Sequence, residues 1–290
     1  MPLVTVVIPT FDRRALVCEA VASVLAQTFA DFELIVVDDG SLDETAGELA
    51  ARFEDSRLRI VSQTNAGASA ARNRGAAAGH GEWLAFLDSD DTWLPPKLEH
   101  QLRALADHPE TPACYTEEIW YRDGRWANPR NVHAKHSGWI FPNCLPLCII
   151  SPSSILMRRV LFEALGGFDE TLPACEDYDL WLRLSARHPI LLVEERLVVK
   201  RNGHPGQLSR AHWGLDRFRV RALWKLARDP EIPWELRRQA LETAARKSGV
   251  VAAGALKRGH LARHEVFDVS RKEALRWLES GTGEPLPPGT

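Results

Sequence analysis

Long apolar runs are missing from this sequence. The longest candidate, from Leu145 to Met157, is broken by Pro146, Pro152 and three serines, whereas a membrane-spanning helix needs about 20 mostly apolar residues. The chain also begins without the basic segment and the small-residue cleavage site of a secretory signal. We therefore expect a cytoplasmic protein without a transmembrane segment.

Net charge and cysteine are both low. The 36 basic residues nearly balance 39 acidic ones, giving a formal charge of −3, so we expect no nucleic acid as a partner. The five cysteines are scattered and odd in number, which disfavours a disulfide scaffold and agrees with a reducing compartment. Cys144 and Cys148 have no neighbouring Cys or His to complete a zinc site, so we interpret them as buried thiols.

Two nucleotide-binding motifs are absent as well. No Gly-x-Gly-x-x-Gly follows the first strand-like run, and no Gly-Lys-Ser/Thr triplet occurs anywhere. Both motifs let a glycine-rich backbone approach phosphate groups closely. Their absence argues against a dinucleotide-dependent dehydrogenase and against a P-loop phosphotransferase.

The first hundred residues do contain a regular alternation of strand and helix signals. This alternation predicts an α/β fold with a mostly parallel sheet and right-handed crossovers. The expected strands are at 4–8, 34–37, 58–61 and 83–87, and the expected helices at 15–27, 43–53 and 66–78. The Ser41 to Glu44 spacing predicts a capping box at the start of the second helix.

Beyond residue 112 the pattern loosens and then becomes helical. We expect a strand at 154–157, an amphipathic helix at 176–187 and a strand at 190–200. After residue 209 the apolar spacing predicts further helices at 215–228, 234–247, 250–263 and 271–278.

Acidic residues gather at the ends of two predicted strands. Asp88-Ser89-Asp90-Asp91 follows one strand and Asp38-Asp39-Gly40-Ser41 another. Ligands bind beyond the carboxyl ends of parallel strands, so both groups are predicted to converge there with Pro9-Thr10. Crowded carboxylates repel one another unless a cation lies among them, and Mg²⁺ or Mn²⁺ prefers oxygen ligands. The structural alternatives are a solvated turn with a helix cap and an Asx turn.

Three further groups each have two interpretations. Glu176-Asp177-Tyr178-Asp179 begins a helix, where acids either act as a general base or compensate the helix dipole. The aromatic residues from Trp120 to Phe141 form either an acceptor platform or core packing. Basic residues on the last helices mark a solvated face, or docking on an anionic membrane or a partner; they include Arg217, Arg219, Arg221, Lys225, Arg237, Arg238 and Lys257.

Five ordered motifs occur between residues 3 and 210. They are Val7-Ile8-Pro9-Thr10-Phe11, Val36-Val37-Asp38-Asp39-Gly40-Ser41, Asn65-Ala66-Gly67 with Ala71-Arg72-Asn73, Phe86-Leu87-Asp88-Ser89-Asp90-Asp91, and Gly166-Gly167-Phe168-Asp169 with Glu176-Asp177-Tyr178-Asp179-Leu180-Trp181. In this order they resemble the family 2 inverting glycosyltransferases. The resemblance implies the GT-A fold, a Rossmann-like sheet flanked by helices.

The resemblance also implies a role for each matching residue. Asp90 would ligate a divalent cation, Mn²⁺ or Mg²⁺, and Asp88 would reach the metal or the ribose. Asp177 matches the general base. His204 is a looser match to a histidine near the metal or the diphosphate.

The other implied site residues surround the two substrates. Asp39, with Asp38, would hold the base, and Arg72 would lie near the nucleotide or pyrophosphate. Pro9, Thr10 and Ser89 complete the implied donor site. The candidates for binding the acceptor are Glu176, Trp120 and Trp139.

The implied reaction moves a sugar from a nucleoside diphosphate donor, a UDP-sugar by preference, to a hydroxyl of a glycan or lipid-linked glycan. No Gln-x-x-Arg-Trp motif is present, which together with the missing membrane spans favours a non-processive enzyme. One alternative is a catalytically silent, nucleotide-binding relative that acts as an interaction module. Another is a nucleotidyltransferase, although the Gly- and Lys/Arg-rich loop that it needs is missing.

The length of 290 residues corresponds to about two domains. We divide it into a nucleotide-sugar-binding half (1–110), an acceptor-binding and catalytic half (111–210), a helical extension (211–280) and a disordered tail (281–290). The extension carries too many large apolar side chains for free helices. We expect it to pack on the catalytic domain, with a homodimer and peripheral contact with the inner face of a membrane as the alternatives.

Overall fold

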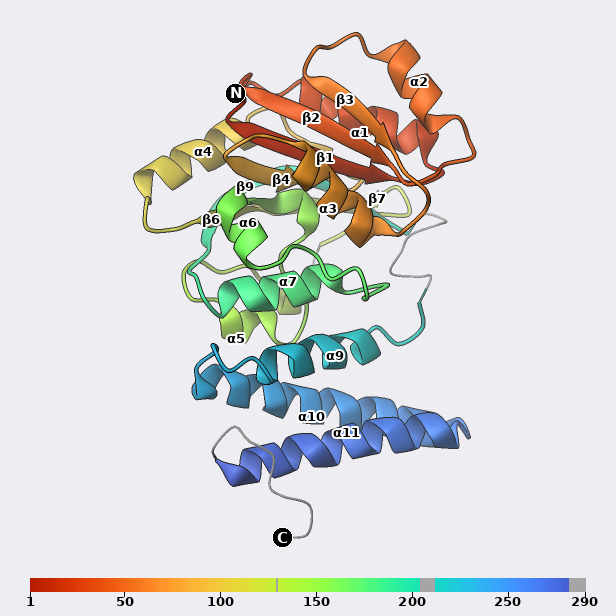
Figure 1. Cartoon of the computed structure of the whole chain (residues 1–290), viewed down its shortest axis with the longest axis vertical. Coiled ribbons are helices and arrows are strands. Elements are labelled where there is room, and N and C mark those ends of the chain that lie inside the picture. The colour runs from red at the N-terminus through yellow and green to blue at the C-terminus, as the bar shows by residue number, and fades with distance from the viewer. Residues whose placement is uncertain (129, 204–211, 282–290) are drawn as a thin grey trace.

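A single mixed sheet organises the molecule (Figure 1). The computed structural model describes residues 1–128, 130–203 and 212–281. The described residues form a nine-stranded sheet in the order β3-β2-β1-β4-β8-β6-β9-β5, with β7 paired to β6. The strands are β1 (Val4–Thr10), β2 (Phe32–Asp38), β3 (Leu58–Ser62), β4 (Trp83–Phe86), β5 (Thr92–Trp93), β6 (Ala113–Arg122), β7 (Arg125–Trp126), β8 (Ile155–Arg158) and β9 (Leu191–Asn202).

Helices cover the sheet and continue beyond it into a separate layer (Figure 1). They are α1 (Arg14–Leu25), α2 (Thr45–Arg52), α3 (Ala68–Ala78), α4 (Lys97–Asp107), α5 (Phe141–Cys144), α6 (Arg159–Ala164), α7 (Glu176–Ser185), α9 (Asp216–Ala227), α10 (Trp234–Lys257) and α11 (Leu261–Ser280). The α/β class and the helical C-terminal extension are confirmed.

The first four strands in sequence form the parallel half of the sheet, because β1 pairs with β2 and β4 and β2 pairs with β3, all parallel. All seven residues of β1 are buried, as expected for a strand covered on both faces. Val4, Val6 and Ile8 pack in the cluster that contains α1, whereas Val7 packs in the cluster that contains α3.

Helix α3 approaches the sheet closely because of a glycine. A Cβ at Gly75 would lie 2.3 Å from Val7 Cγ1, so only the bare backbone fits there. The alanines of α3 have the same effect along the helix, and Ala71 and Ala76 are buried against the sheet. Small side chains thus set the depth at which α3 lies.

The second half of the sheet brings distant segments together. Strand β8 is antiparallel to both β4 and β6, β6 is parallel to β9, and β5 is antiparallel to β9. Because β5 directly follows Asp91 and pairs Thr92 with Val199, the end of β9 lies beside the acidic turn after β4.

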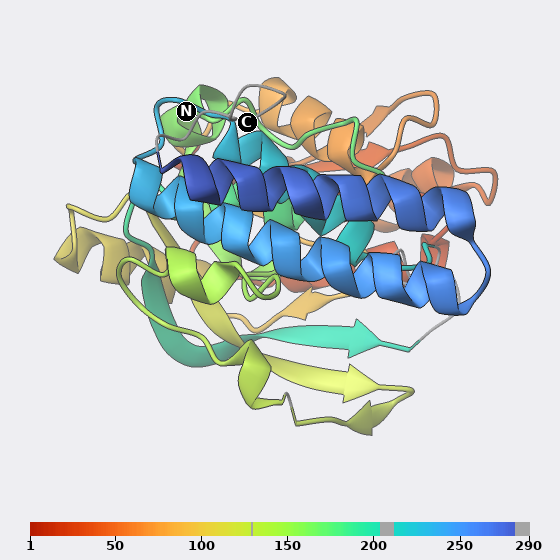
Figure 2. The same ribbon diagram turned by 90° about the horizontal axis from the view of Figure 1, so that it is seen from below.

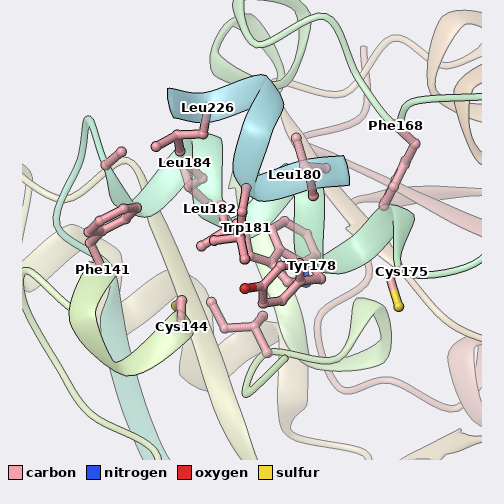
Figure 3. Close-up of a cluster of buried hydrophobic side chains, with 14 of the residues drawn as sticks. Phe141, Cys144, Phe168, Cys175, Tyr178, Leu180, Trp181, Leu182, Leu184 and Leu226 are labelled. Atoms are coloured by element: carbon pink, nitrogen blue, oxygen red, sulfur yellow. The ribbon is translucent and has the colours of Figure 1, made fainter. Parts of the chain in front are cut away.

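Helix α7 is buried more completely than its amphipathic pattern predicts. Every residue of α7 except Asp177 is buried. Figure 3 draws its apolar side chains in one cluster with Phe141, Phe168 and Leu226. Burial on several sides is tolerated because Asp179, one of its polar residues, accepts hydrogen bonds from Arg183 Nε and Nη2 at 2.9 and 2.6 Å.

The C-terminal helices pack on this core as expected. Helix α9 contacts α7, α10 contacts α9, and α10 and α11 lie side by side (Figure 2). Leu223 and Leu226 of α9 are buried in the same cluster as α7. The indoles of Trp224 and Trp277 meet edge to face at 5.7 Å, which joins α9 to α11. The predicted tail lies outside the described residues except for Gly281.

Three local expectations are wrong. The helices predicted at 234–247 and 250–263 are not two separate helices: Trp234–Lys257 is the single helix α10, which accommodates Gly249, and the chain turns at Gly259, where φ is +74°, so that 261–263 already belong to α11. Helix α11 is longer than the predicted 271–278. No capping box forms, because Ser41 Oγ accepts a hydrogen bond from Asp12 N while Glu44 adopts φ 61° before α2.

None of the helices in the described part of the chain is both long enough and apolar enough to cross a membrane.

Candidate functional site

A cavity of about 560 Å³ lies at the carboxyl ends of the parallel strands. The ends of β1, β2 and β4 meet there with the start of α7 and the end of β9, so the predicted convergence is confirmed. The cavity is lined by these residues from the sequence prediction: Pro9, Thr10, Asp39, Arg72, Asp88, Ser89, Asp90, Glu176 and Asp177.

The turn after β4 brings three carboxylates together. One oxygen from each of Asp88, Asp90 and Asp91 lies within 4.8 Å of the others. The backbone N–H of Asp91 donates to the carbonyl oxygen of Asp88 at 2.9 Å, which closes the turn. Oxygen ligands at this spacing suit a hard divalent cation such as Mg²⁺ or Mn²⁺.

Asp91 serves the scaffold of the site. Its Oδ2 accepts a hydrogen bond from Ser153 Oγ at 2.7 Å, and its Oδ1 accepts one from the backbone N–H of Arg201 at 3.0 Å. Ser153 Oγ in turn accepts a hydrogen bond from the backbone N–H of Asp88. Burial raises the pKa of Asp91 well above its usual value. Asp88 and Asp90 are only partly buried, whereas Asp91 is buried.

Arg72 joins the acidic turn to the start of α7. Its Nη2 lies 2.6 Å from Asp88 Oδ1 and its Nη1 lies 2.7 Å from Glu176 Oε1, with only 5% of the Arg72 side chain exposed. Burial works against the charged carboxylate of Asp88, yet the guanidinium holds the pKa of Asp88 below its usual value. For Glu176 the effect of burial outweighs that of the Arg72 charge, so the pKa of Glu176 is raised. The two acidic segments are thus fixed relative to each other by one buried cation.

Asp177 is half-buried at the start of a helix whose other residues are all buried. Its Oδ1 accepts a hydrogen bond from the backbone N–H of Tyr178 at 2.6 Å, and its Oδ2 accepts one from Cys148 Sγ at 3.3 Å. Burial and the neighbouring Asp177 raise the pKa of Cys148 well above its usual value, so it remains a thiol donor. Cys175, just before α7, adopts φ 64°, a costly conformation for a residue with a side chain.

The opposite side of the cavity holds Asp39 and Thr10. Asp39 Oδ1 accepts hydrogen bonds from Gln63 Nε2 and the backbone N–H of Ala66. Asp39 Oδ2 accepts one from the backbone N–H of Gly67, which adopts φ +92°, a conformation that favours glycine. One acceptor position remains on Oδ2. Thr10 Oγ1 is buried without a hydrogen-bond partner among the described residues. A buried hydroxyl that lines a cavity in this way is available to a ligand.

Apart from Arg72, sequence reasoning missed the cations of the cavity. Lys200 and Arg201 from β9, Arg219 from α9 and Arg13 before α1 all line it. Arg13 Nη1 lies 3.0 Å from Asp90 Oδ2. Burial alone would lower the pKa of Lys200, but nearby carboxylates, first Glu118 and then those of the cavity, raise it above its usual value. Arg219 was expected on a solvated face, and no local pattern marks it otherwise.

Some predicted site residues lie elsewhere. Asp38 Oδ1 accepts a hydrogen bond from the backbone N–H of Ser41 in the turn after β2, and Asp38 does not line the cavity. Trp139 is 65% exposed, and Trp120 donates its indole N–H to Glu118 Oε2; neither lines the cavity. His204 lies outside the described residues.

Comparisons with protein families agree with the motifs. The family model described as glycosyl transferase family 2 matches residues 5–166, and one described as glycosyltransferase-like family 2 matches residues 130–218. An uncharacterized glycosyltransferase of Rickettsia felis is 32% identical over 72% of this chain, and the match spans 35% of that protein. The chain thus spans about a third of the length of this relative.

The match to a second relative covers less of this chain but more of the relative's own length. The Escherichia coli protein named UDP-Glc:alpha-D-GlcNAc-diphosphoundecaprenol beta-1,3-glucosyltransferase WfgD is 31% identical over 63% of this chain and 69% of its own.

Two solved structures share the fold. TarS 1–349 of S. aureus, solved with UDP-GlcNAc, superposes with a TM-score of 0.67 at 17% identity, covering 94% of this chain and 92% of its own. The mannosyltransferase PcManGT of Pyrobaculum calidifontis, solved with GDP-Man and Mn²⁺, superposes with a TM-score of 0.62 at 22% identity, covering 97% and 86%.

Proposed function

The chain belongs to glycosyltransferase family 2, and from that premise we propose that it transfers a sugar from a nucleoside diphosphate sugar to an acceptor hydroxyl, with metal dependence and inversion. One observation carries this proposal: a single cavity contains both the carboxylate turn and Asp177. The turn is suited to bind a cation that also contacts the diphosphate, and Asp177 is suited to act as the proton acceptor.

The donor nucleotide would lie between Thr10 and Asp39. Thr10 Oγ1 offers a buried hydroxyl, and Asp39 keeps one acceptor position for an N–H of the base. We favour a uracil base for two reasons. The name of the E. coli relative gives UDP-Glc as its donor, and the S. aureus structure was solved with UDP-GlcNAc. Asp38 has no place in this proposal, because it holds its own turn.

Asp90 and Asp88 would hold the divalent cation, Mn²⁺ or Mg²⁺. When bound, the cation supplies a Lewis acid that neutralises charge on the departing diphosphate. Lys200 and Arg219 add fixed positive charge to the same cavity, and charge that is already in place needs no reorganisation during the reaction. Arg72 keeps the turn at a constant distance from α7.

Asp177 would accept the proton from the attacking hydroxyl. It is the one residue of α7 that is not buried, and it lines the cavity. The Tyr178 amide donates to one of its oxygens, and the other lies 3.3 Å from Cys148 Sγ, whose single S–H is shared with the Ile150 carbonyl oxygen at 3.0 Å. The unoccupied acceptor positions of the carboxylate remain for the acceptor hydroxyl.

The acceptor is proposed as a glycan or lipid-linked glycan, used non-processively. Of the three acceptor candidates only Glu176 lines the cavity, and its Oε1 is already held by Arg72. Trp120 and Trp139 would take part only through an acceptor that extends outside the cavity. A cytoplasmic location, with peripheral contact at the inner face of a membrane, fits this class of acceptor.

The test is release of nucleoside diphosphate from a panel of UDP-, GDP- and dTDP-sugars, with Mn²⁺, with Mg²⁺ and with EDTA. We expect release with one or a few UDP-sugars, and loss of release in EDTA. Tight binding of a nucleotide sugar without release, in the presence of candidate glycan acceptors, would instead identify a silent nucleotide-binding module. Full release in EDTA would refute the metal dependence.

A further inference from the structure

A second hollow lies beside the candidate active site, between the C-terminal helices. This groove, of about 920 Å³, is formed by the residues before α9, the second half of α10 and the start of α11. Four apolar side chains line it: Trp213, Leu215, Val250 and Val251. The size and the apolar lining are typical of sites that bind small molecules.

The polar lining of the groove is mostly cationic. Arg219, Arg258 and Arg263 line it, and Asp216 is its one lining carboxylate. Asp216 Oδ1 is already occupied, because Arg219 Nη1 and Lys247 Nζ both lie 2.9 Å from it. Within the described parts of the chain, Arg258 and Arg263 have no carboxylate partner. The groove thus has an excess of positive charge.

The two unpaired guanidinium groups are held in place without acids. Arg263 Cζ lies 3.6 Å from the centroid of the Trp213 ring, and Arg217 Cζ lies 4.4 Å from the same centroid. Arg258 lies over the bare backbone of Gly254, where a Cβ would come within 2.9 Å of its Nη2. Arg217 and Arg263 carry like charges beside one indole, and an anion in the groove would offset the charge of Arg263, which lines it.

The groove adjoins the active-site cavity. Leu215 and Arg219 line both hollows, so the groove and the cavity adjoin at these two side chains. Arg219 is 16% exposed, and its Nε is buried with no hydrogen-bond partner among the described residues. One unsatisfied donor therefore lies at the junction between the two hollows.

We propose that this groove binds the lipid-phosphate end of the acceptor: an aliphatic chain on Trp213, Val250 and Val251, and its phosphate or diphosphate against Arg258, Arg263 and Arg219. The sugar that follows the phosphate then lies in the active-site cavity, near Asp177. This inference rests on the proposed transfer reaction, because it assigns the acceptor of that reaction. The charge and the apolar lining are complementary to one molecule that carries both features.

The test uses farnesyl diphosphate as the probe and measures its binding to the full chain by calorimetry without divalent cations. We expect Arg258→Glu and Arg263→Glu each to weaken binding about tenfold or more, since each removes a charged contact and adds repulsion. Arg276→Glu is the matched control, because it makes the same charge change on α11 at an exposed position outside the groove. Equal binding by all four proteins would overturn the proposal.

A second pair of measurements tests the apolar half. Val250 lines the groove yet is 64% exposed, so Val250→Asp leaves the core intact. This substitution is expected to weaken binding of farnesyl diphosphate and to leave binding of inorganic pyrophosphate unchanged. If pyrophosphate binds the wild-type chain as tightly as farnesyl diphosphate does, the groove is an anion site without a lipid component. If phosphatidylglycerol vesicles bind through Arg263 while farnesyl diphosphate does not compete, the groove is a membrane-docking surface. Either result refutes the proposal.

The proposed function is tested separately in the same proteins. Binding of UDP-sugar with Mn²⁺ is expected to be the same in the wild type, Arg258→Glu and Arg263→Glu, because neither arginine lines the active-site cavity. Retained donor binding without any binding of farnesyl diphosphate would overturn only the lipid-phosphate site. Absent donor binding and release in the wild type would overturn the transfer reaction itself.

Discussion

The carboxylates and the cations of the active-site cavity are assembled in opposite ways. Asp88, Asp90 and Asp91 come from one turn, which a local hydrogen bond closes. The cations come from four separate parts of the chain: Arg13, Arg72, Lys200 and Arg219. The carboxylates are suited to the chemistry, and the cations make their crowding tolerable, since unpaired buried charge is costly. A motif therefore shows where the chemistry lies, whereas its electrostatic support depends on the whole fold.

The largest expected effect is at the acidic turn. Asp90→Ala removes a proposed metal ligand and is expected to lower transfer by at least about 10³-fold, or roughly 4 kcal/mol. The free energy of unfolding should fall little, because the contacts that hold the turn come from Asp91 and Ser153 and the ion pair with Arg13 that the substitution removes is partly exposed. Nucleoside diphosphate release and urea unfolding measure the two quantities. Normal release by this variant would show that the turn does not hold the metal.

The next effect is on stability and concerns the cation between the two acidic segments. Arg72→Leu leaves Asp88 and Glu176 without their shared buried partner, so the free energy of unfolding should fall by about 3–5 kcal/mol. Urea unfolding measures the loss. The double variant Arg72→Leu/Glu176→Gln should recover part of it, because it removes one of the stranded charges. Unchanged stability of the single variant would mean that the pair is not formed in solution.

A smaller effect on turnover is expected at α7. Asp177→Asn keeps the shape of the side chain and removes the proton acceptor, so kcat should fall by about 10²-fold, or roughly 2.7 kcal/mol. Donor affinity should barely change, as measured by calorimetry with the UDP-sugar and Mn²⁺. A collapse of donor affinity with normal turnover at saturation would place Asp177 in the donor site.

The smallest effect is predicted for a cation that no motif marks. Lys200→Met keeps an apolar stem and removes a positive charge beside several carboxylates, so kcat/KM should fall about tenfold, or roughly 1.4 kcal/mol. Lys200→Arg should restore much of the rate, because the charge rather than a proton transfer is what matters. Steady-state kinetics on the three proteins decide this. If both variants match the wild type, Lys200 has no part in transfer.

The sequence predicts the parallel half of the fold well because its signals are local. Continuous apolar runs and the alanine-rich helix 68–78 identify strands and a helix that pack on both faces of the sheet. The convergence of Pro9-Thr10 with Asp39 and the acidic turn follows from the parallel order alone.

The remaining features depend on contacts that the pattern does not contain. Asp38 and Asp39 are adjacent, but only the structure shows that one holds a turn while the other faces the cavity. Arg219 resembles a solvated helix residue until α9 packs on α7. Likewise, Asp179 and Arg183 make the sequence of α7 look amphipathic, although both are buried as an ion pair and every residue of α7 except Asp177 is buried.

The close packing of α3 against the sheet has a consequence for genetics. Gly75 lies one turn after Arg72, and any side chain there would collide with Val7. A screen for heat-sensitive alleles should therefore recover substitutions at Gly75, a residue that does not line the active-site cavity. Such an allele would shift α3 and withdraw Arg72 from its two carboxylates, so that a packing defect would have the phenotype of a lost catalytic residue.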